Sequence, residues 1–499
     1  MNMNEQQVQD IVAEVLRKLG KVSSAPADSG GRAPANNPGN PPAPAHPRPR
    51  PAPSSGGRRF GIFNDVPAAC RAAHDAFIQL GDKGLEGRRK VIDIVKSMAE
   101  DNAERWGRDE LEETKIGRLD HKIEKLQILK LVPGVEFIHP FGMSGDNGIT
   151  MEEYTPFGLV GSVTPATHSV PTMSGNIINM VAAGNSCIFN PHPGAARCAA
   201  ASARAYNEAI HRELGIENLI CVIETPTLES FDAICADEHV RLLCITGGPA
   251  VVKAAMKTGK RAICAGPGNP PVVVTCCADH RKAAQSIIQG GAYDNNLLCI
   301  GEKQVFVVDR VADELIGHLE REGAARLKTA QIDKLKQEAF IWHQDNGSSH
   351  AAINKDLVGR DATLLAERAG ATVPSGTQLL FGETAADDVF VEEEQMMPFV
   401  PIVRVRDVQE AIQRAKESEH NYRHTAIIHT RNVDHMTAMA RALDTSLFVK
   451  NGPCMAGLGL GGEGYLSYSI ATPTGEGVTN PRTFTRTRRC VMVDNLKIY

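Results

Sequence analysis

Short apolar runs alternate with helical segments from Tyr154 onward, and this alternation restricts the possible folds more than any other feature of the chain. The pattern predicts strands over 158–163, 186–189, 219–223, 242–245 and 261–264, and helices over 173–183, 195–214, 228–236 and 250–257. Strands that are separated by helices favour a parallel sheet with helices on both faces. We therefore expect a doubly wound α/β fold.

The pattern extends in both directions from this region. Residues 66–80 and 85–131 are predicted to be helical, and a hairpin is expected at about 135–154. After Gly301 a second α/β pattern begins, with 304–308 as its first strand. A length of 499 residues allows two or three domains, each with its own core.

The first 57 residues differ from the rest. Apolar residues at helical spacing over 1–20 predict a short amphipathic helix, which is marginal alone in water and needs a partner surface. Residues 21–57 hold 10 of the 29 prolines and almost no large apolar side chain, so we expect a disordered linker. We interpret the helix as a docking peptide; packing on its own enzyme is the alternative.

Composition excludes several classes of protein. A net charge of −5 gives no overall attraction to nucleic acid. No apolar run approaches the roughly 20 residues that span a bilayer, and the polar N-terminus is not expected to be a signal peptide. The twelve cysteines contain no CxxC pair, which indicates a reducing cytosol. We expect eleven of them to be buried as small apolar residues.

The remaining cysteine, Cys299, is the candidate nucleophile. It ends the polar segment Asp294-Asn-Asn-Leu-Leu-Cys299, just after a helix predicted over 282–289. This segment lies at the junction of the two α/β patterns, and sites commonly form between domains. Spacing alone leaves open a purely structural cysteine.

Several ordered motifs raise the case for Cys299. They are Thr155-Pro-Phe-Gly-Leu-Val-Gly161, Asn190-Pro-His-Pro193, Ile245-Thr-Gly-Gly248, Ala265-Gly-Pro-Gly-Asn-Pro-Pro271, the segment 294–303, and Thr474-Gly-Glu-Gly-Val-Thr479. With them, residues 58–499 resemble the aldehyde dehydrogenase superfamily, and more narrowly the CoA-acylating propanal and acetaldehyde dehydrogenases of bacterial microcompartments. The resemblance implies an NAD-binding domain over 58–266, a catalytic domain over 267–471 and a C-terminal segment over 472–499.

The same resemblance implies a mechanism. The Cys299 thiolate attacks a short aldehyde, hydride leaves to NAD, and coenzyme A takes the acyl group from the resulting thioester. The oxyanion donors are expected to be the Cys299 N–H and a side chain near Thr167. The superfamily commonly has asparagine there, and Pro165-Ala-Thr-His168 departs from that pattern.

A second departure from the superfamily pattern indicates whether CoA or water accepts the acyl group. Hydrolytic relatives carry a glutamate that activates water, and Ala265 stands at the matching position. We therefore expect acyl-CoA as the product. The alternatives are a hydrolytic enzyme with a relocated base, such as Glu302 or His168, and an inactive interaction protein that uses the fold as a scaffold.

NAD is expected to bind without a Gly-x-Gly-x-x-Gly turn. Gly457, Gly459 and Gly462 match that spacing, but they lead into no helix, so we interpret them as a flexible loop near the site. The expected cofactor contacts are instead Thr246, Gly247, Gly248, Gly266, Asn190 and Glu394. Gly247 and Gly248 allow a helix start to approach phosphates, and Glu394 matches the family's ribose-binding glutamate. Asn190 replaces a lysine of hydrolytic relatives, which favours NAD over NADP.

Partners and location also follow from the resemblance. The N-terminal helix and linker resemble encapsulation peptides, which implies a shell protein as the partner of residues 1–20 and a cytoplasmic enzyme inside a microcompartment lumen. The hairpin at about 135–154 and the final strand around 490–493, which could pair with a neighbouring subunit, resemble an oligomerisation arm and imply a dimer or tetramer. No metal site is expected, because no His/Cys/Asp cluster has ligand spacing. His168 and His192 are interpreted as non-catalytic.

Overall fold

A computed structural model describes residues 59–345 and 348–494, which belong to one folded unit, Gly57–Tyr499. The helix predicted over 1–20 and the linker predicted over 21–57 lie outside the described residues. Among the described helices, none is long and apolar enough to cross a membrane.

The first sheet has six parallel strands in the order β1-β6-β5-β4-β7-β8. Their bounds are β1 (Ile62–Phe63), β4 (Leu159–Thr164), β5 (Ser186–Pro191), β6 (Ile220–Ile223), β7 (Val240–Thr246) and β8 (Ala262–Ala265). The five strands predicted in this region are all present. The order, which turns back at β4, confirms the doubly wound α/β fold.

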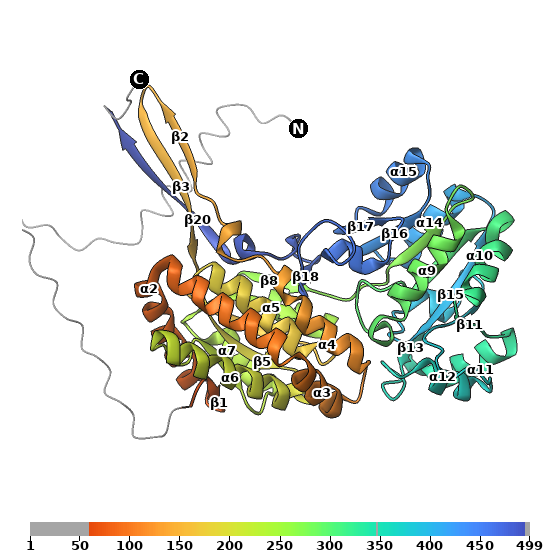
Figure 1. The fold of residues 1–499 in the computed structure, drawn as a ribbon, viewed down its shortest axis with the longest axis horizontal. Coiled ribbons are helices and arrows are strands. Elements are labelled where there is room, and N and C mark those ends of the chain that lie inside the picture. Colours follow the sequence, from red (N-terminus) through yellow and green to blue (C-terminus); the bar gives the residue numbers. More distant parts are fainter. Residues whose placement is uncertain (1–58, 346–347, 495–499) are drawn as a thin grey trace, which may run out of the picture. The chain divides into compact units, whose positions relative to one another are not determined.

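Helices cover both faces of this sheet, as Figure 1 shows in orange to green. They are α2 (Val66–Asp101), α3 (Ala103–Thr114), α4 (Leu119–Gln127), α5 (Ser169–Ala182), α6 (Ala196–Leu214), α7 (Leu228–Ala236) and α8 (Pro249–Met256). Strand β5 shows why its sequence is apolar throughout. Cys187 and Phe189 pack with α5 and α6, whereas Ile188 packs with α7 and α8 on the other face.

The helical prediction for 85–131 was wrong in its continuity. The chain forms α3, α4 and a 3-10 helix, Ile128–Leu131, in place of one helix, and α2 continues through 80–85 with a non-helical Gly84. Lys115 and Gly117 have φ values of 60° and 86°, a left-handed conformation that ends α3 and turns the chain into α4.

The second sheet has seven parallel strands in the order β11-β14-β15-β10-β9-β16-β17. The strands are β9 (Pro271–Val274), β10 (Gln304–Val308), β11 (Ala325–Arg326), β14 (Leu380–Glu383), β15 (Phe399–Val405), β16 (Thr425–His429) and β17 (Leu447–Lys450). The predicted strand 304–308 is β10, but it is not the first strand of the pattern, because β9 precedes it and pairs with it.

Helices also flank the second sheet. They are α9 (His280–Gly291), α10 (Asp309–Arg321), α11 (Thr329–Ala339), α12 (Ala362–Ala369), α13 (Val389–Glu392), α14 (Val408–Ser418) and α15 (Val433–Leu443). A separate hairpin joins β12 (Phe340–Asp345) to β13 (Ser348–Ile353), and β18 (Ile470–Ala471) pairs with β19 (Gly477–Val478).

Three antiparallel strands form a small exposed sheet that stands apart in Figure 1. They are β2 (Phe141–Gly145), β3 (Gly148–Pro156) and β20 (Thr485–Val493). The hairpin predicted at about 135–154 is thus present, although its first residues form a 3-10 helix, Val135–Phe137. The C-terminal strand pairs with β3 of its own chain over nine residues, from Thr485 opposite Pro156 to Val493 opposite Gly148.

The cysteines follow the prediction only in part. All twelve are free, and eight of the eleven that we expected to be buried are buried. Cys276 and Cys277 are half-buried because β9 ends at Val274, which places them in the following turn and not inside a strand. Cys490 is exposed because it lies on β20.

Candidate active site

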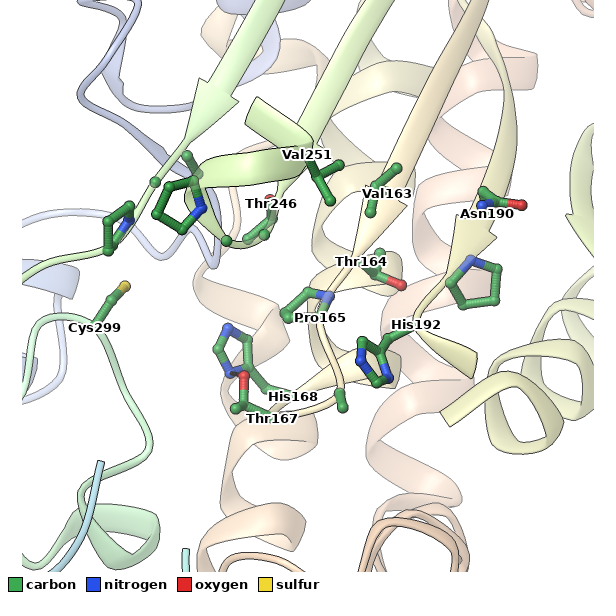
Figure 2. Close-up of a pocket in the computed structure, with 18 of the residues that line it drawn as sticks. Val163, Thr164, Pro165, Thr167, His168, Asn190, His192, Thr246, Val251 and Cys299 are labelled. Atoms are coloured by element: carbon green, nitrogen blue, oxygen red, sulfur yellow. Dashed lines mark hydrogen bonds between the residues drawn. The ribbon is translucent and has the colours of Figure 1, made fainter. Parts of the chain in front are cut away.

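A cavity of about 620 Å³ lies where the carboxyl ends of the first sheet's strands meet the chain segment before β10. It is within the size range of ligand sites. Every residue predicted for the site lines this cavity: Thr167, Asn190, Thr246, Gly247, Gly248, Gly266, Cys299 and Glu394. Figure 2 shows Cys299 pointing into the cavity, with Thr167, His168 and Thr246 on other elements around it.

The loop that carries Cys299 has an unusual backbone. It begins with a 3-10 turn, Tyr293–Asn296, in which Asp294, Asn295 and Asn296 have φ values of 49°, 56° and 61°. Three consecutive left-handed residues without a glycine are costly, at about 1–3 kcal/mol each, and persist only where the surroundings fix them. All three side chains are buried.

The Cys299 thiol is held in its protonated form. Burial and, to a smaller extent, the Glu394 carboxylate raise its pKa to about 12, although Lys303 and Lys125 act in the opposite direction. A thiol in this state is a poor nucleophile. Its reactivity therefore depends on what else enters the cavity.

Thr167 and His168 form a pair at the end of β4. The Thr167 hydroxyl and the His168 Nδ1 lie 2.8 Å apart. His168 is buried, and burial lowers its pKa well below the usual value, so the ring is neutral at pH 7. When Nδ1 carries the ring proton, it donates to the Thr167 oxygen and leaves the hydroxyl proton free for a ligand.

The start of α8 fits a phosphate group. Gly248 is the N-cap and no side chain caps the helix, which leaves backbone N–H groups of the first turn open. A Cβ atom on Gly248 would meet nothing within 4 Å, so the space above the turn is open. Thr246 lies just before it and bonds the Ser469 hydroxyl at 2.8 Å. These residues suit the pyrophosphate of a dinucleotide.

Asn190 lines the cavity but has its amide engaged by the protein. Its Nδ2 donates to the Thr227 carbonyl at 3.2 Å, and its Oδ1 accepts from the Ser230 hydroxyl at 2.6 Å. Thr227 and Ser230 form the capping box at the start of α7. Asn190 therefore fixes the wall at α7 and contributes no positive charge there.

Comparison with known proteins decides the family. The family model "Aldehyde dehydrogenase family" matches residues 62–463. The chain belongs to the aldehyde dehydrogenase family.

Curated and solved relatives match nearly all of this aldehyde dehydrogenase. The acetylating acetaldehyde dehydrogenase EutE of Salmonella typhimurium is 42% identical over 99% of this chain and 100% of its own length. A Rhodopseudomonas palustris propionaldehyde dehydrogenase, solved with bound CoA and an acylated cysteine, is 40% identical, with a TM-score of 0.84 over 88% of this chain and 100% of its own. A propionaldehyde dehydrogenase of the Clostridium phytofermentans fucose utilisation bacterial microcompartment is 39% identical, with a TM-score of 0.85 and the same coverage.

In this aldehyde dehydrogenase the end of β8 offers no general base. Ala265 lines the cavity and has no proton acceptor on its side chain. Glu302, an alternative base, does not line the cavity. It packs under α9, where a Cβ on Gly290 would lie 1.8 Å from its Oε2, and its Oε1 accepts from the Cys454 N–H at 3.0 Å. Of the two alternatives, only His168 faces the cavity.

Glu394 follows Glu392 and Glu393 in the chain but lies in the wall of the cavity. It lines the cavity with Cys299, and burial raises its pKa to about 7, against the opposing effect of Lys303. A carboxyl that titrates near neutral pH in a cavity fits either a ligand-binding role or a role in proton transfer.

His424 was not predicted to lie near the site. It is fully buried, burial lowers its pKa to about 4, and its Nε2 has no hydrogen-bond partner in the described chain. It lies close to the Cys299 loop, because a Cβ on Gly268 would come within 2.6 Å of the Cys299 carbonyl oxygen and 2.9 Å of the His424 ring. Its sequence neighbours gave no signal, since it is 125 residues from Cys299 along the chain.

The glycine motif at 457–462 does not contribute to the wall of the cavity. Its first residues belong to a 3-10 helix, Cys454–Leu458, and it opens no α-helix, as predicted. None of its glycines lines the cavity. That this loop is flexible and lies near the site stays a prediction. A Cβ on Gly462 would come within 2.5 Å of the Ala456 carbonyl oxygen, which explains a glycine there by close packing. Within the described part of the chain, no cluster of three or more His, Cys, Asp or Glu side chains could hold a metal ion.

Proposed function

We propose that this enzyme oxidises a short aldehyde with NAD⁺ and coenzyme A to give acyl-CoA, NADH and a proton, through a thioester on Cys299. The observation that carries the proposal is the pairing of Cys299 with Ala265 in one cavity, a nucleophile without a water-activating carboxylate. The relatives named above support it, because one is acetylating and another holds CoA beside an acylated cysteine.

Cys299 and Thr167 have separate roles in the proposed reaction. The Cys299 thiol releases its proton to solvent, its sulfur forms a bond to the aldehyde carbon, and the Cys299 N–H with the Thr167 hydroxyl donates to the oxygen that becomes negative. The hydride then leaves that carbon, and the C=O bond re-forms as the thioester carbonyl. When bound, the nicotinamide dinucleotide supplies the hydride acceptor. The thioester carbonyl on Cys299 is then attacked by the CoA thiol, the bond to the Cys299 sulfur breaks, and acyl-CoA leaves.

Cofactor contacts are proposed along the rest of the cavity. Gly247 and Gly248, with Thr246 and Gly266 beside them, receive the pyrophosphate at the start of α8. Glu394 faces the ribose next to the nicotinamide. Asn190 shapes the opposite wall and is neutral, so it offers no positive charge to a 2′-phosphate. We therefore predict a preference for NAD⁺ over NADP⁺. The ratio of kcat/KM with NAD⁺ to that with NADP⁺ tests it.

The acceptor is tested by leaving CoA out. We expect a short aldehyde series from acetaldehyde to propanal and lactaldehyde to give NADH at a rate that falls sharply without CoA. Unchanged NADH formation with carboxylic acid as product would instead support the hydrolytic alternative. NADH formation from any of these aldehydes excludes the scaffold alternative. The same series identifies the preferred aldehyde. We expect kcat/KM to differ only modestly among these substrates, because one methyl or hydroxyl group separates them.

We further propose that residues 1–20 dock the enzyme to a shell protein inside a bacterial microcompartment. Two observations support this. One structural relative belongs to such a compartment, and the similarity to the Salmonella enzyme extends over 99% of this chain. A fluorescent protein fused to residues 1–57 should enter purified compartments, whereas the same fusion without residues 1–20 should not.

A homo-oligomer, dimer or tetramer, is proposed from the small sheet. Its exposed apolar side chains are Phe141, Met143, Val491, Met492 and Val493. Such a surface commonly marks a protein contact. Among the residues that the structure describes, the edge strands β2 and β20 pair with no strand on their outer sides, which leaves them open for pairing. Light scattering should give a multiple of the chain mass. We assign the cofactor domain to 58–266, the catalytic domain to 267–471 and a C-terminal segment to 472–499.

A further inference from the structure

Two lysines on α4 contact the two separate segments that form the proposed catalytic centre. Lys125 Nζ binds the Asp294 carboxylate at the start of the Cys299 loop, and neither side chain is exposed. Lys122 Nζ, one turn earlier, donates to the Thr167 carbonyl at 3.4 Å and to Glu110 at 2.9 Å. The Cys299 loop and the Thr167 segment are thus attached to the same short helix.

The contacts of Asp294 hold in place the strained 3-10 turn at the start of the Cys299 loop. Besides the bond from Lys125, the Asp294 Oδ1 accepts from the Arg118 N–H at 2.8 Å, and the Asp294 N–H donates to the His121 Nδ1 at 2.9 Å. Gly117 packs so closely that a Cβ there would lie 2.3 Å from the Asp294 Oδ1. The loop before α4 and α4 itself therefore hold the first of the three left-handed residues.

The rest of the turn is held from the other side. Asn295 Nδ2 donates to the Gly359 carbonyl at 2.9 Å, and Lys303 Nζ donates to the Asn296 carbonyl at 2.7 Å. With these contacts, each of the three left-handed residues has its own partner. Of these partners, Lys125 and His121 lie on α4, the helix that also reaches Thr167.

The Thr167 end is fixed by the same charge pairing. Glu110, on α3, accepts from Lys122 with one carboxylate oxygen and from the Val170 N–H at 2.9 Å with the other. Val170 lies in the first turn of α5, three residues after Thr167. Lys122 and Glu110 therefore hold both sides of the segment that supplies the proposed oxyanion donor.

Burial of the four charged side chains costs free energy. Lys122, Glu110, Lys125 and Asp294 are 2% exposed or less. Buried ion pairs commonly stabilise a fold no better than apolar side chains of the same volume, so stability alone does not explain two of them one turn apart. Orientation of the reacting groups is a use that apolar side chains do not serve.

We propose that Lys122 and Lys125 form a two-point clamp, which sets the distance between the Cys299 sulfur and the Thr167 hydroxyl and so positions the aldehyde carbonyl between nucleophile and oxyanion donor. Both are positioning residues, because neither lines the cavity. The expected effect on kcat rests on the proposed function, whereas the expected effect on the structure of the Cys299 loop does not.

The test removes charges in pairs, so that no buried ion is left alone. Lys125→Met with Asp294→Asn keeps an oxygen for the Arg118 N–H, and Lys122→Met with Glu110→Gln keeps one for the Val170 N–H. Lys130→Met is the matched control, since Lys130 lies in the 3-10 helix that follows α4 but is 61% exposed and pairs with Glu100 at the surface. Each variant is assayed at saturating aldehyde, NAD⁺ and CoA, per titrated active site, with its melting temperature.

We expect each double variant to lose about 10²-fold in kcat, with the KM for NAD⁺ unchanged, because a displacement of the order of 1 Å has that effect on reacting groups. Lys130→Met should match the wild type. A role in folding alone would lower the melting temperature without lowering kcat per active site. A folded double variant with wild-type kcat would overturn the clamp. Each ion pair fixes a different segment, so either double variant alone decides.

Hydrogen exchange of the peptide 293–301, measured without substrates, separates the clamp from the proposed function. Faster exchange in the Lys125→Met, Asp294→Asn variant than in Lys130→Met supports the clamp, even if the wild type forms no acyl-CoA. Unchanged exchange there would overturn the clamp, even if acyl-CoA formation is confirmed.

Discussion

Cys299 and Cys277 lie in opposite electrostatic surroundings. The Cys299 thiol in the cavity has its pKa raised to about 12 by burial and by Glu394. Cys277, after β9, has its pKa lowered to about 6, because hydrogen bonds from Thr275, Thr430 and the backbone before α15 outweigh the effect of its burial. A search for reactive thiolates alone would select Cys277. A search for a cavity with convergent groups selects Cys299.

The difference teaches that a catalytic thiol need not be reactive at rest. A protonated thiol such as that of Cys299 reacts slowly with alkylating and oxidising agents. Cys277 is charged at neutral pH but faces no cavity that holds the predicted cofactor residues. The predictions below use this contrast.

Replacing each cysteine should give the largest contrast. We expect Cys299→Ala to lower kcat by more than about 10³-fold, as removal of a nucleophile does, with the fold intact. Cys277→Ala should leave kcat near the wild-type value. Steady-state NADH formation and circular dichroism measure both. Appreciable activity in Cys299→Ala would mean that another residue carries the acyl group.

Alkylation of the free enzyme should show the reverse order. At pH 7 Cys277 is mostly thiolate, whereas Cys299 is about 10⁻⁵ thiolate; the lower nucleophilicity of an acidic thiol offsets part of this, which leaves Cys277 roughly 10²-fold faster. Iodoacetamide labelling followed by peptide mass spectrometry measures the two rates. The Cys299 rate should rise tenfold for each pH unit between 7 and 10, because only the thiolate reacts. Faster labelling of Cys299 at pH 7 would show that its thiol is already ionised.

The cavity around Cys299 can be altered without touching the thiol. Ala265→Glu should introduce a water-activating base and increase the share of carboxylic acid among the products about tenfold, a cautious figure beside the 10²–10⁴ of general-base catalysis. Ala265→Gln has the same size but no base and should keep acyl-CoA as the product. Equal acid formation by both variants would point to added space for water as the cause.

Removal of residues 1–20 should have the smallest effect on catalysis. We expect kcat and KM close to the wild-type values, with loss of recruitment to the shell. Steady-state kinetics of the truncated enzyme test the first part and co-purification with compartments the second. A large fall in kcat would mean that the helix packs on the enzyme.

The sequence was sufficient for the elements around the cavity and for its predicted lining. Strands such as β5 are buried on both faces, so their apolar runs are continuous and their bounds are readily seen. The eight site residues lie at the ends of such strands or in motifs of the resemblance, and all of them reach the cavity. Their roles stay predictions.

What the sequence lacked were contacts between distant residues and changes of backbone conformation. Lys125 and Asp294 are 169 residues apart, and nothing near Lys125 indicates that it is buried. The left-handed conformation of Lys115 and Gly117 separates α3 from α4, although both residues lie in a stretch that was predicted to be helical. Cys277 follows an apolar run that continues past the end of β9, so the sequence alone does not show that it lies in a turn.

The most direct test of a Cys299 thioester that waits for CoA is to stop the reaction before CoA is present. The enzyme is incubated with propanal and NAD⁺, quenched in acid and digested, and the peptide that contains Cys299 is weighed. We predict one propanoyl group on Cys299 for each NADH formed, and its transfer to CoA when CoA is added before the quench. Free propanoic acid as the main product, or an unmodified Cys299 beside NADH, would contradict the account.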